Sequence, residues 1–153
     1  MKALFLDIDG VLNTLDEVFN YGMDFIDPAK VEILKTIIVR TNAQIVLSST
    51  WRLSERNRNL VTKALAEKNL NFIDCTIELP KKLTQWINRA EEIAEWLLRH
   101  PQVRRFAILD DNSDAGIGLE KDFFQTDYDV GLTEDTADKI VEHLNFEATC
   151  ARH

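Results

Sequence analysis

The alternation of short apolar runs with helical patterns is the feature that most constrains the fold of this chain. Runs typical of buried strands are four or five residues long and lie at 2–6, 44–47, 71–74, 105–109 and 123–126. Apolar residues at helical spacing lie at 28–41, 51–69, 89–99 and from Thr133 onward. This order predicts a central, mostly parallel β-sheet with helices on both faces, which is a three-layer α/β sandwich.

Local signals mark where the helices begin. Asp27 and Pro28 supply an N-cap and a first-turn proline, and Asn88 and Thr133 are the N-caps of two further helices. The 153 residues are enough to bury one core without disulfides or a structural metal. We therefore expect a single domain over residues 1–153.

Hydropathy and cysteine usage indicate the compartment. No apolar run approaches the roughly 20 residues that span a bilayer, and acids interrupt the N-terminal run, which excludes a signal peptide. The two cysteines, Cys75 and Cys150, lack metal-ligand spacing and indicate no disulfide framework. A cytoplasmic protein without a membrane partner is expected.

The formal net charge of −8 argues against a broadly electropositive nucleic-acid binder. Arg52, Arg56 and Arg58 nevertheless lie close together in the sequence. They form either a solvated helix face or a small positive rim that holds a phosphorylated substrate. The charge alone leaves both interpretations open.

Acidic or hydroxyl side chains follow three of the predicted strands, and they are Asp7, Asp9, Ser48, Ser49, Thr50, Asp110, Asp111 and Asp114. The carboxyl ends of parallel strands meet at one edge of a sheet, where ligands collect. Converging carboxylates repel each other unless a cation neutralises them, and oxygen ligands without His or Cys favour Mg²⁺. The sequence therefore predicts a magnesium site and phosphoryl chemistry, although Asp114 alone is also explained as a helix N-cap.

Asp7 and Asp9 are two residues apart, so in an extended strand their side chains share one face and both reach one bound phosphate. A carboxylate serves as the nucleophile in some phosphoryl transfers, and Asp7 is the candidate. A second acid must protonate the leaving alcohol and later activate water, and Asp9 is placed for that work. Gly10 lets the backbone bend sharply and expose its amides to the ligand.

Binding the phosphate requires donors and a fixed cation. Ser48 and Ser49 stand where a strand ends and a helix begins, so they offer hydroxyls and free N–H groups, and they are equally explained as an N-cap. Arg89, before the fourth strand, is the first candidate for the cation, and Lys82 in the preceding loop is the second. Either is alternatively a surface charge.

The motifs resemble those of a known superfamily. Residues 7–13, Asp-Ile-Asp-Gly-Val-Leu-Asn, resemble the DxDGxx signature of the haloacid dehalogenase (HAD) superfamily, whose members are mostly aspartyl-phosphate phosphatases. Residues 45–48 are similar to its second motif, Arg89 stands in the range of its third, and residues 108–111 are similar to its fourth. Further stretches resemble the HAD domain of Swiss-Army-knife RNA repair proteins, and they are 45–52, 89–93, 96–97, 125–127 and 131–133.

This resemblance implies a role for each matching acid. Asp7 would be the nucleophile and a metal ligand, and Asp9 the acid/base and a ligand through its backbone carbonyl. Asp111 would be the third protein ligand. Asp110 or Asp114 would orient metal-bound water.

The resemblance also implies that Ser48 binds the phosphate and that Arg89 supplies the fixed positive charge, although this position is more often Lys in the superfamily. Many members carry a cap domain over the site. Here residues 13–30 predict only a flap-sized hairpin or loop, and residues 52–88 a helix and connections, which are too short for a domain of roughly 50 residues. We expect no large cap domain.

An uncapped site is open to large substrates, so a phosphate at a nucleic-acid end or on a protein fits better than an enclosed metabolite. Trp51 and Arg52 either contact such a substrate or are a buried aromatic and a surface charge. Arg52 and Asp114 are therefore retained as candidate substrate contacts.

Two other functions are compatible with acids at strand ends. A receiver-like regulatory module holds a phosphoryl group on Asp without turnover, but receivers need a lysine after the last strand, where this chain has residues 125–127, Gln-Thr-Asp. A catalytically silent module that binds phosphate or Mg²⁺ has no use for Asp9 as a proton donor. The sequence favours a Mg²⁺-dependent phosphomonoester hydrolase that forms an aspartyl-phosphate.

Overall fold

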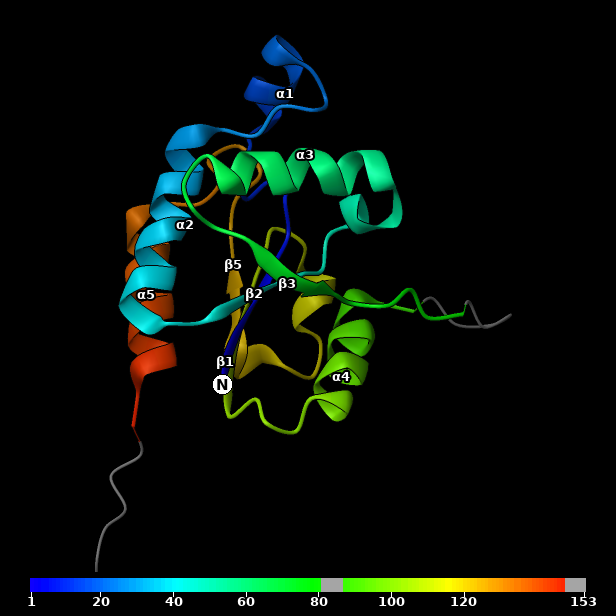
Figure 1. Ribbon diagram of the computed structural model, residues 1–153, viewed down its shortest axis with the longest axis vertical. Coiled ribbons are helices and arrows are strands. Elements are labelled where there is room, and N and C mark those ends of the chain that lie inside the picture. The colour runs from blue at the N-terminus through cyan, green and yellow to red at the C-terminus, as the bar shows by residue number, and fades with distance from the viewer. Residues whose placement is uncertain (81–86, 148–153) are drawn as a thin grey trace, which may run out of the picture.

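A five-stranded parallel sheet forms the centre of the computed structural model, which describes residues 1–80 and 87–147 (Figure 1). The strands are β1 (Lys2–Leu6), β2 (Gln44–Leu47), β3 (Phe72–Cys75), β4 (Arg105–Asp110) and β5 (Phe123–Gln125). Their order across the sheet is β3-β2-β1-β4-β5, and every pairing is parallel. The predicted α/β sheet is confirmed.

The helices begin at residues that cap their free N–H groups. The described residues contain α1 (Leu15–Tyr21), α2 (Pro28–Thr41), α3 (Glu55–Ala66), α4 (Arg89–Arg99) and α5 (Glu134–Asn145). Asp27, Asn88 and Thr133 accept backbone N–H groups at the starts of α2, α4 and α5, as predicted. Among the described residues, no helix has the length and apolar character that a membrane crossing requires.

The two faces of the sheet are covered by different helices. Leu4 and Leu6 of β1 belong to a core cluster that includes apolar residues of α2, α3 and α5. The alternate residues Ala3 and Phe5 belong to a second cluster, which includes residues of α4. Figure 1 accordingly shows α2 and α5 on one side of the strands and α4 on the other. The predicted three layers are present.

The strand order reverses at β1. In open parallel sheets, ligands bind outside the carboxyl ends of the strands at such a point. The hydrogen bonding between neighbouring strands continues here one residue past the strand ends. The Asp7 N–H donates to Leu109 O at 3.0 Å, and the Ser48 N–H donates to Leu6 O at 3.0 Å. The backbone at both residues is therefore fixed by the sheet itself.

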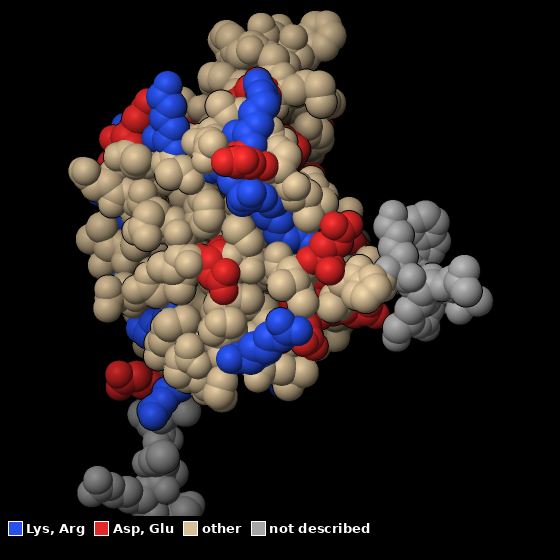
Figure 2. All heavy atoms as spheres, turned by 45° about the vertical axis from the view of Figure 1, so that its right-hand side comes forward, with Lys and Arg blue, Asp and Glu red and all other residues tan. Residues whose placement is uncertain are grey.

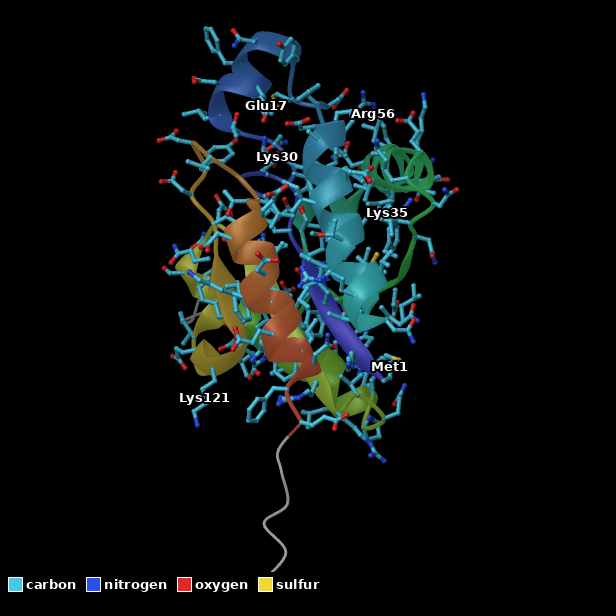
Figure 3. The ribbon with its side chains drawn as sticks, turned by 90° about the vertical axis from the view of Figure 1, so that its left-hand side faces the viewer. Met1, Glu17, Lys30, Lys35, Arg56 and Lys121 are labelled. Carbon is cyan, nitrogen blue, oxygen red and sulfur yellow. The ribbon has the colours of Figure 1, made fainter. Side chains whose placement is uncertain are left out.

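The hairpin or loop predicted for residues 13–30 is wrong, because the segment contains α1. The Thr14 hydroxyl accepts the Glu17 N–H at 3.2 Å, and the Glu17 carboxylate accepts the Thr14 N–H at 3.1 Å. No residue of α1 is buried, and seven residues are too few for the apolar positions Leu15, Val18 and Phe19 to set a clear helical period. Figure 3 shows α1 at the end of the molecule beyond α2, where Lys30 pairs with Glu17 at 2.9 Å and with Asp27 at 2.8 Å.

The single helix predicted for residues 51–69 is also wrong. Residues Thr50–Leu53 form a short 3₁₀ helix, η1, and α3 starts only at Glu55. The Ser54 side chain accepts the Asn57 N–H and caps α3, so it ends one element and begins the next. The break turns Trp51 and Arg52 into the protein.

Candidate active site

Three carboxylates converge where β1 and β4 end. One oxygen each from Asp7, Asp110 and Asp111 lies within 4.8 Å of the others, and among the described residues the carboxylate of Asp9 is not part of this group. Asp110 has no exposed surface and Asp7 is 4% exposed, whereas Asp111 is half-buried. A set of oxygen ligands alone suits a hard divalent cation.

Burial and mutual repulsion make this cluster unfavourable in its ionised form. The pKa of Asp7 is raised well above its usual value by burial and then by the charge of Asp110, and the guanidinium of Arg89 opposes the shift only in part. Burial also raises the pKa of Asp111. A cation bound among the three carboxylates would relieve the repulsion, which is the behaviour of a metal site.

Arg89, the first residue of α4, places a fixed positive charge beside the cluster. Its Nη1 lies 3.2 Å from Asp7 Oδ1 and 2.5 Å from Asp110 Oδ2. Burial alone would lower the pKa of Arg89, but the charges of Asp7 and Asp110 outweigh it and raise the pKa. The Asn88 cap fixes the start of α4, so the position of this guanidinium depends on the helix start. Lys82, the second candidate, lies outside the described residues.

Asp114 faces the start of α4. Its Oδ2 accepts the Arg89 N–H at 3.5 Å, and its Oδ1 is buried without a partner among the described residues. A negative charge at a helix N-terminus is favourable, so the contact helps to hold Arg89. The structure thus places the Asp114 carboxylate against the backbone of Arg89.

The Asp9 carboxylate lies apart from the acidic cluster and is held by two neutral donors. Its Oδ2 accepts the indole N–H of Trp51 at 3.0 Å, and its Oδ1 accepts the side-chain amide of Asn13 at 3.0 Å. Sequence reasoning missed both contacts. Asn13 lies within the first motif, so its contact with Asp9 could have been inferred from the sequence. Trp51 is 42 residues from Asp9, and no local pattern links the two.

Gly10 allows the loop that follows Asp9 to pass close to the residues that follow β4 and β5. Its φ is +78°, and a Cβ there would lie 2.6 Å from Asp111 Cγ and 2.7 Å from Tyr128 Cδ2. The Thr126 hydroxyl donates to Gly10 O at 2.6 Å. Burial and the charges of Asp9 and Asp111 raise the pKa of Tyr128, so its ring is a further neighbour of the site that sequence reasoning missed.

The two serines after β2 differ in what they bind. The Ser49 hydroxyl oxygen accepts the Trp51 N–H at 3.2 Å and serves as the N-cap of η1. The Ser48 hydroxyl has no exposed surface and no partner among the described residues. A buried hydroxyl without a partner is unusual in a native protein, so Ser48 retains a donor that a ligand can use.

Arg52 lies inside the protein. Its side chain donates to the carbonyls of Ser48, Ser49 and Thr76 at 2.8 to 3.3 Å, and its Nη2 lies 2.9 Å from Glu92 Oε2. The side chain is only 4% exposed. The structure therefore gives Arg52 an internal role that links η1 to α4, so the residue lies neither on a solvated helix face nor on a positive rim.

The sequence matches the family described as the HAD domain in Swiss Army Knife RNA repair proteins over residues 3–137. The chain belongs to this family. The match confirms the resemblance that the motifs gave, and it points to a HAD-type hydrolase whose acidic cluster can bind a metal. No curated protein matches the sequence closely enough to count as a relative.

Proposed function

We propose that this HAD domain is a Mg²⁺-dependent phosphatase that hydrolyses a phosphomonoester through a phosphorylated Asp7. The observation that carries the proposal is the convergence of Asp7, Asp110 and Asp111 beside the guanidinium of Arg89. Phosphoryl transfer is catalysed mainly by positioning and by positive charge near the transferring group. A metal site and a fixed guanidinium around one candidate nucleophile meet both needs.

The donor set supports Mg²⁺ as the metal. Asp7, Asp110 and Asp111 offer only oxygen ligands, and two of these carboxylates are buried where they require neutralisation. The family resemblance adds the backbone carbonyl of Asp9 as a ligand. When bound, Mg²⁺ would supply positive charge to the phosphate oxygens.

The protein residues divide the first step among them. An oxygen of Asp7 attacks phosphorus as the bond to the leaving oxygen breaks, and Asp9 gives its proton to that oxygen. Arg89 balances the negative charge of the phosphoryl group from the side of α4. The unpartnered hydroxyl of Ser48 donates to a phosphate oxygen.

In the second step water attacks the phosphoryl group on Asp7. Asp9, now ionised, takes a proton from this water as the new bond to phosphorus forms and the bond to Asp7 breaks. Inorganic phosphate and the regenerated carboxylate of Asp7 result. The same residue thus acts first as acid and then as base.

The substrate class that we propose is a phosphate at the end of a nucleic acid or on another large molecule. The name of the matched family refers to RNA repair. Between β1 and α2 the chain adds one helix, the seven-residue α1, which is too small to enclose a substrate as a cap domain would. On the face in Figure 2, Lys and Arg side chains are interspersed with Asp and Glu side chains. Together with the net charge of −8, this favours recognition of a terminal phosphate over a long polyanionic backbone.

The test is phosphate release from an aryl phosphate and from 3′- and 5′-phosphorylated oligonucleotides, with and without Mg²⁺. We expect Mg²⁺-dependent release that falls by about 10³-fold or more in Asp7→Asn. Asp135→Asn is the matched control, because its carboxylate is 80% exposed on α5 and should not affect release. Release that persists in Asp7→Asn, or that needs no metal, would overturn the proposal.

A further inference from the structure

The two oxygens of the Asp9 carboxylate are each held by one uncharged donor. Trp51 Nε1 donates to Oδ2 and Asn13 Nδ2 donates to Oδ1, both at 3.0 Å. Trp51 is 5% exposed and Asn13 has no exposed surface. Because each oxygen has its own donor, the two bonds together restrict the rotation of the Asp9 carboxylate.

Each donor is itself immobilised. The Asn13 side chain also donates to Phe25 O and accepts the Gly10 N–H, both at 3.0 Å. The Trp51 N–H donates to the Ser49 hydroxyl at 3.2 Å. The next residue, Arg52, anchors η1 through its buried pair with Glu92. The orientation of Asp9 is therefore set by segments on both sides of the loop.

We propose that Trp51 and Asn13 are positioning residues that hold Asp9 in line with the leaving oxygen of the substrate. This inference rests on the proposed phosphatase function. In the first step the Asp9 proton must reach the ester oxygen as the phosphorus–oxygen bond breaks, and in the second step Asp9 must receive a proton from the attacking water. One orientation serves both transfers, and a small misplacement of a catalytic group is enough to slow such a step by about 10²-fold.

A purely structural role for Trp51 makes a different prediction. Loss of packing lowers stability and reduces turnover of every substrate, whereas loss of proton donation affects substrates according to their leaving group. Alkyl phosphates have poor leaving groups and need the proton. Activated aryl phosphates, such as dinitrophenyl phosphate, leave without it. The ratio of the two rates therefore reports on positioning.

The chain offers a matched control at Trp96. Its indole N–H donates to Asp74 Oδ2 at 2.8 Å, and the residue is 4% exposed, so Trp51→Phe and Trp96→Phe remove the same kind of bond from equally buried side chains. Trp96 packs with Phe5 and His100 on the α4 face of the sheet. Among the described residues, no hydrogen bond joins the Trp96 side chain to Asp7 or Asp9.

The experiment measures kcat/KM with Mg²⁺ for an alkyl phosphate and for dinitrophenyl phosphate in the full chain, with melting temperature as the check on folding. Trp51→Phe is expected to lower kcat/KM for the alkyl ester by about 10²-fold and to change that for the aryl ester little. Trp96→Phe should leave the ratio of the two rates at the wild-type value. Asn13→Leu, which removes the other donor, should shift the ratio in the direction of Trp51→Phe.

Equal losses on both esters in Trp51→Phe, or a ratio matched by Trp96→Phe, would overturn the positioning role while leaving the phosphatase intact. If Trp51→Phe does not fold, the ratio in Asn13→Leu decides the question in the same way. Absence of release from wild type would instead overturn the proposed function, so the two failures are distinguishable.

Discussion

Asp7 and Asp9 stand two residues apart but in opposite electrostatic surroundings. Asp7 lies among the charged side chains of Asp110, Asp111 and Arg89, which come from β4, its following loop and α4. Asp9 lies between uncharged donors, one from η1 and one from its own loop. The site therefore has a charged side around Asp7 and a neutral side around Asp9.

The difference shows how one short loop can hold two carboxylates for two tasks. On the charged side, ionisation is costly until a metal binds, so that side is built to depend on a cation. On the neutral side, hydrogen bonds fix geometry without adding charge. Variants that affect one side and spare the other test whether this division is real.

The largest expected effect comes from removing the guanidinium of the charged side. Arg89→Ala leaves Asp7 and Asp110 buried without their cation, and breaking a buried pair costs about 3 to 5 kcal/mol. Urea unfolding at neutral pH with a chelator measures the loss. The control Arg40→Ala removes an exposed pair with Asp138, for which about 1 kcal/mol or less is expected. Equal losses in both variants would contradict the charged-side description.

Mg²⁺ should stabilise the protein through the charged side alone. At about 100 times its dissociation constant, Mg²⁺ adds about 2.7 kcal/mol to the free energy of unfolding. Asp111→Asn should abolish most of this gain, whereas Asp9→Asn should keep it, because the Asp9 carboxylate lies outside the acidic cluster. Thermal unfolding with and without Mg²⁺ measures both. Loss of the gain in Asp9→Asn would place that carboxylate on the charged side.

The charged side was largely accessible from sequence. Asp7 and Asp110 come directly after or at the end of apolar runs, and parallel strands bring such ends together whatever the loops do. The N-cap at Asn88 likewise predicts a helix start that presents Arg89. Periodicity and capping are local properties, so they can be read along the chain.

The neutral side was not accessible in the same way. The hydrogen bond between Trp51 and Asp9 depends on η1. This 3₁₀ helix is separate from α3 because Ser54 caps a new helix inside residues 51–69, whose apolar pattern predicts a single helix. The buried position of Arg52 requires Glu92, which is 40 residues away. Such features depend on tertiary partners or on single side chains, and hydrophobic patterns carry neither.

Removing Asp7, the proposed nucleophile, should stabilise the metal-free protein while abolishing the proposed turnover. Asp7→Asn takes a costly buried charge away, and a gain of about 1 to 2 kcal/mol is expected in chelator at about pH 7. Asp9→Asn should give no such gain, because its carboxylate has two donors. Urea unfolding compares the two variants.

The gain in Asp7→Asn should depend on pH with a definite sign. Because the folded-state pKa of Asp7 is raised, the folded protein holds more protons than the unfolded chain between the two pKa values, and stability falls as pH rises through that window. The gain should therefore be small below about pH 4, near the unfolded pKa, and full above the folded pKa. A gain that grows toward low pH would contradict the assignment.

The smallest expected effect lies at Gly10, in the turn where the charged side and the neutral side of the site meet. Thr126→Val removes the hydroxyl that donates to Gly10 O, which should cost about 1 kcal/mol in urea unfolding, since both groups are neutral and buried. The control Thr62→Val removes an exposed bond to Arg58 O and should cost less. Because no charge changes, the loss should be equal at about pH 5 and pH 8 and with or without Mg²⁺. A loss that disappears when Mg²⁺ is added would mean that the metal itself fixes the Gly10 turn, and the boundary between the charged and neutral sides would then lie beyond Gly10.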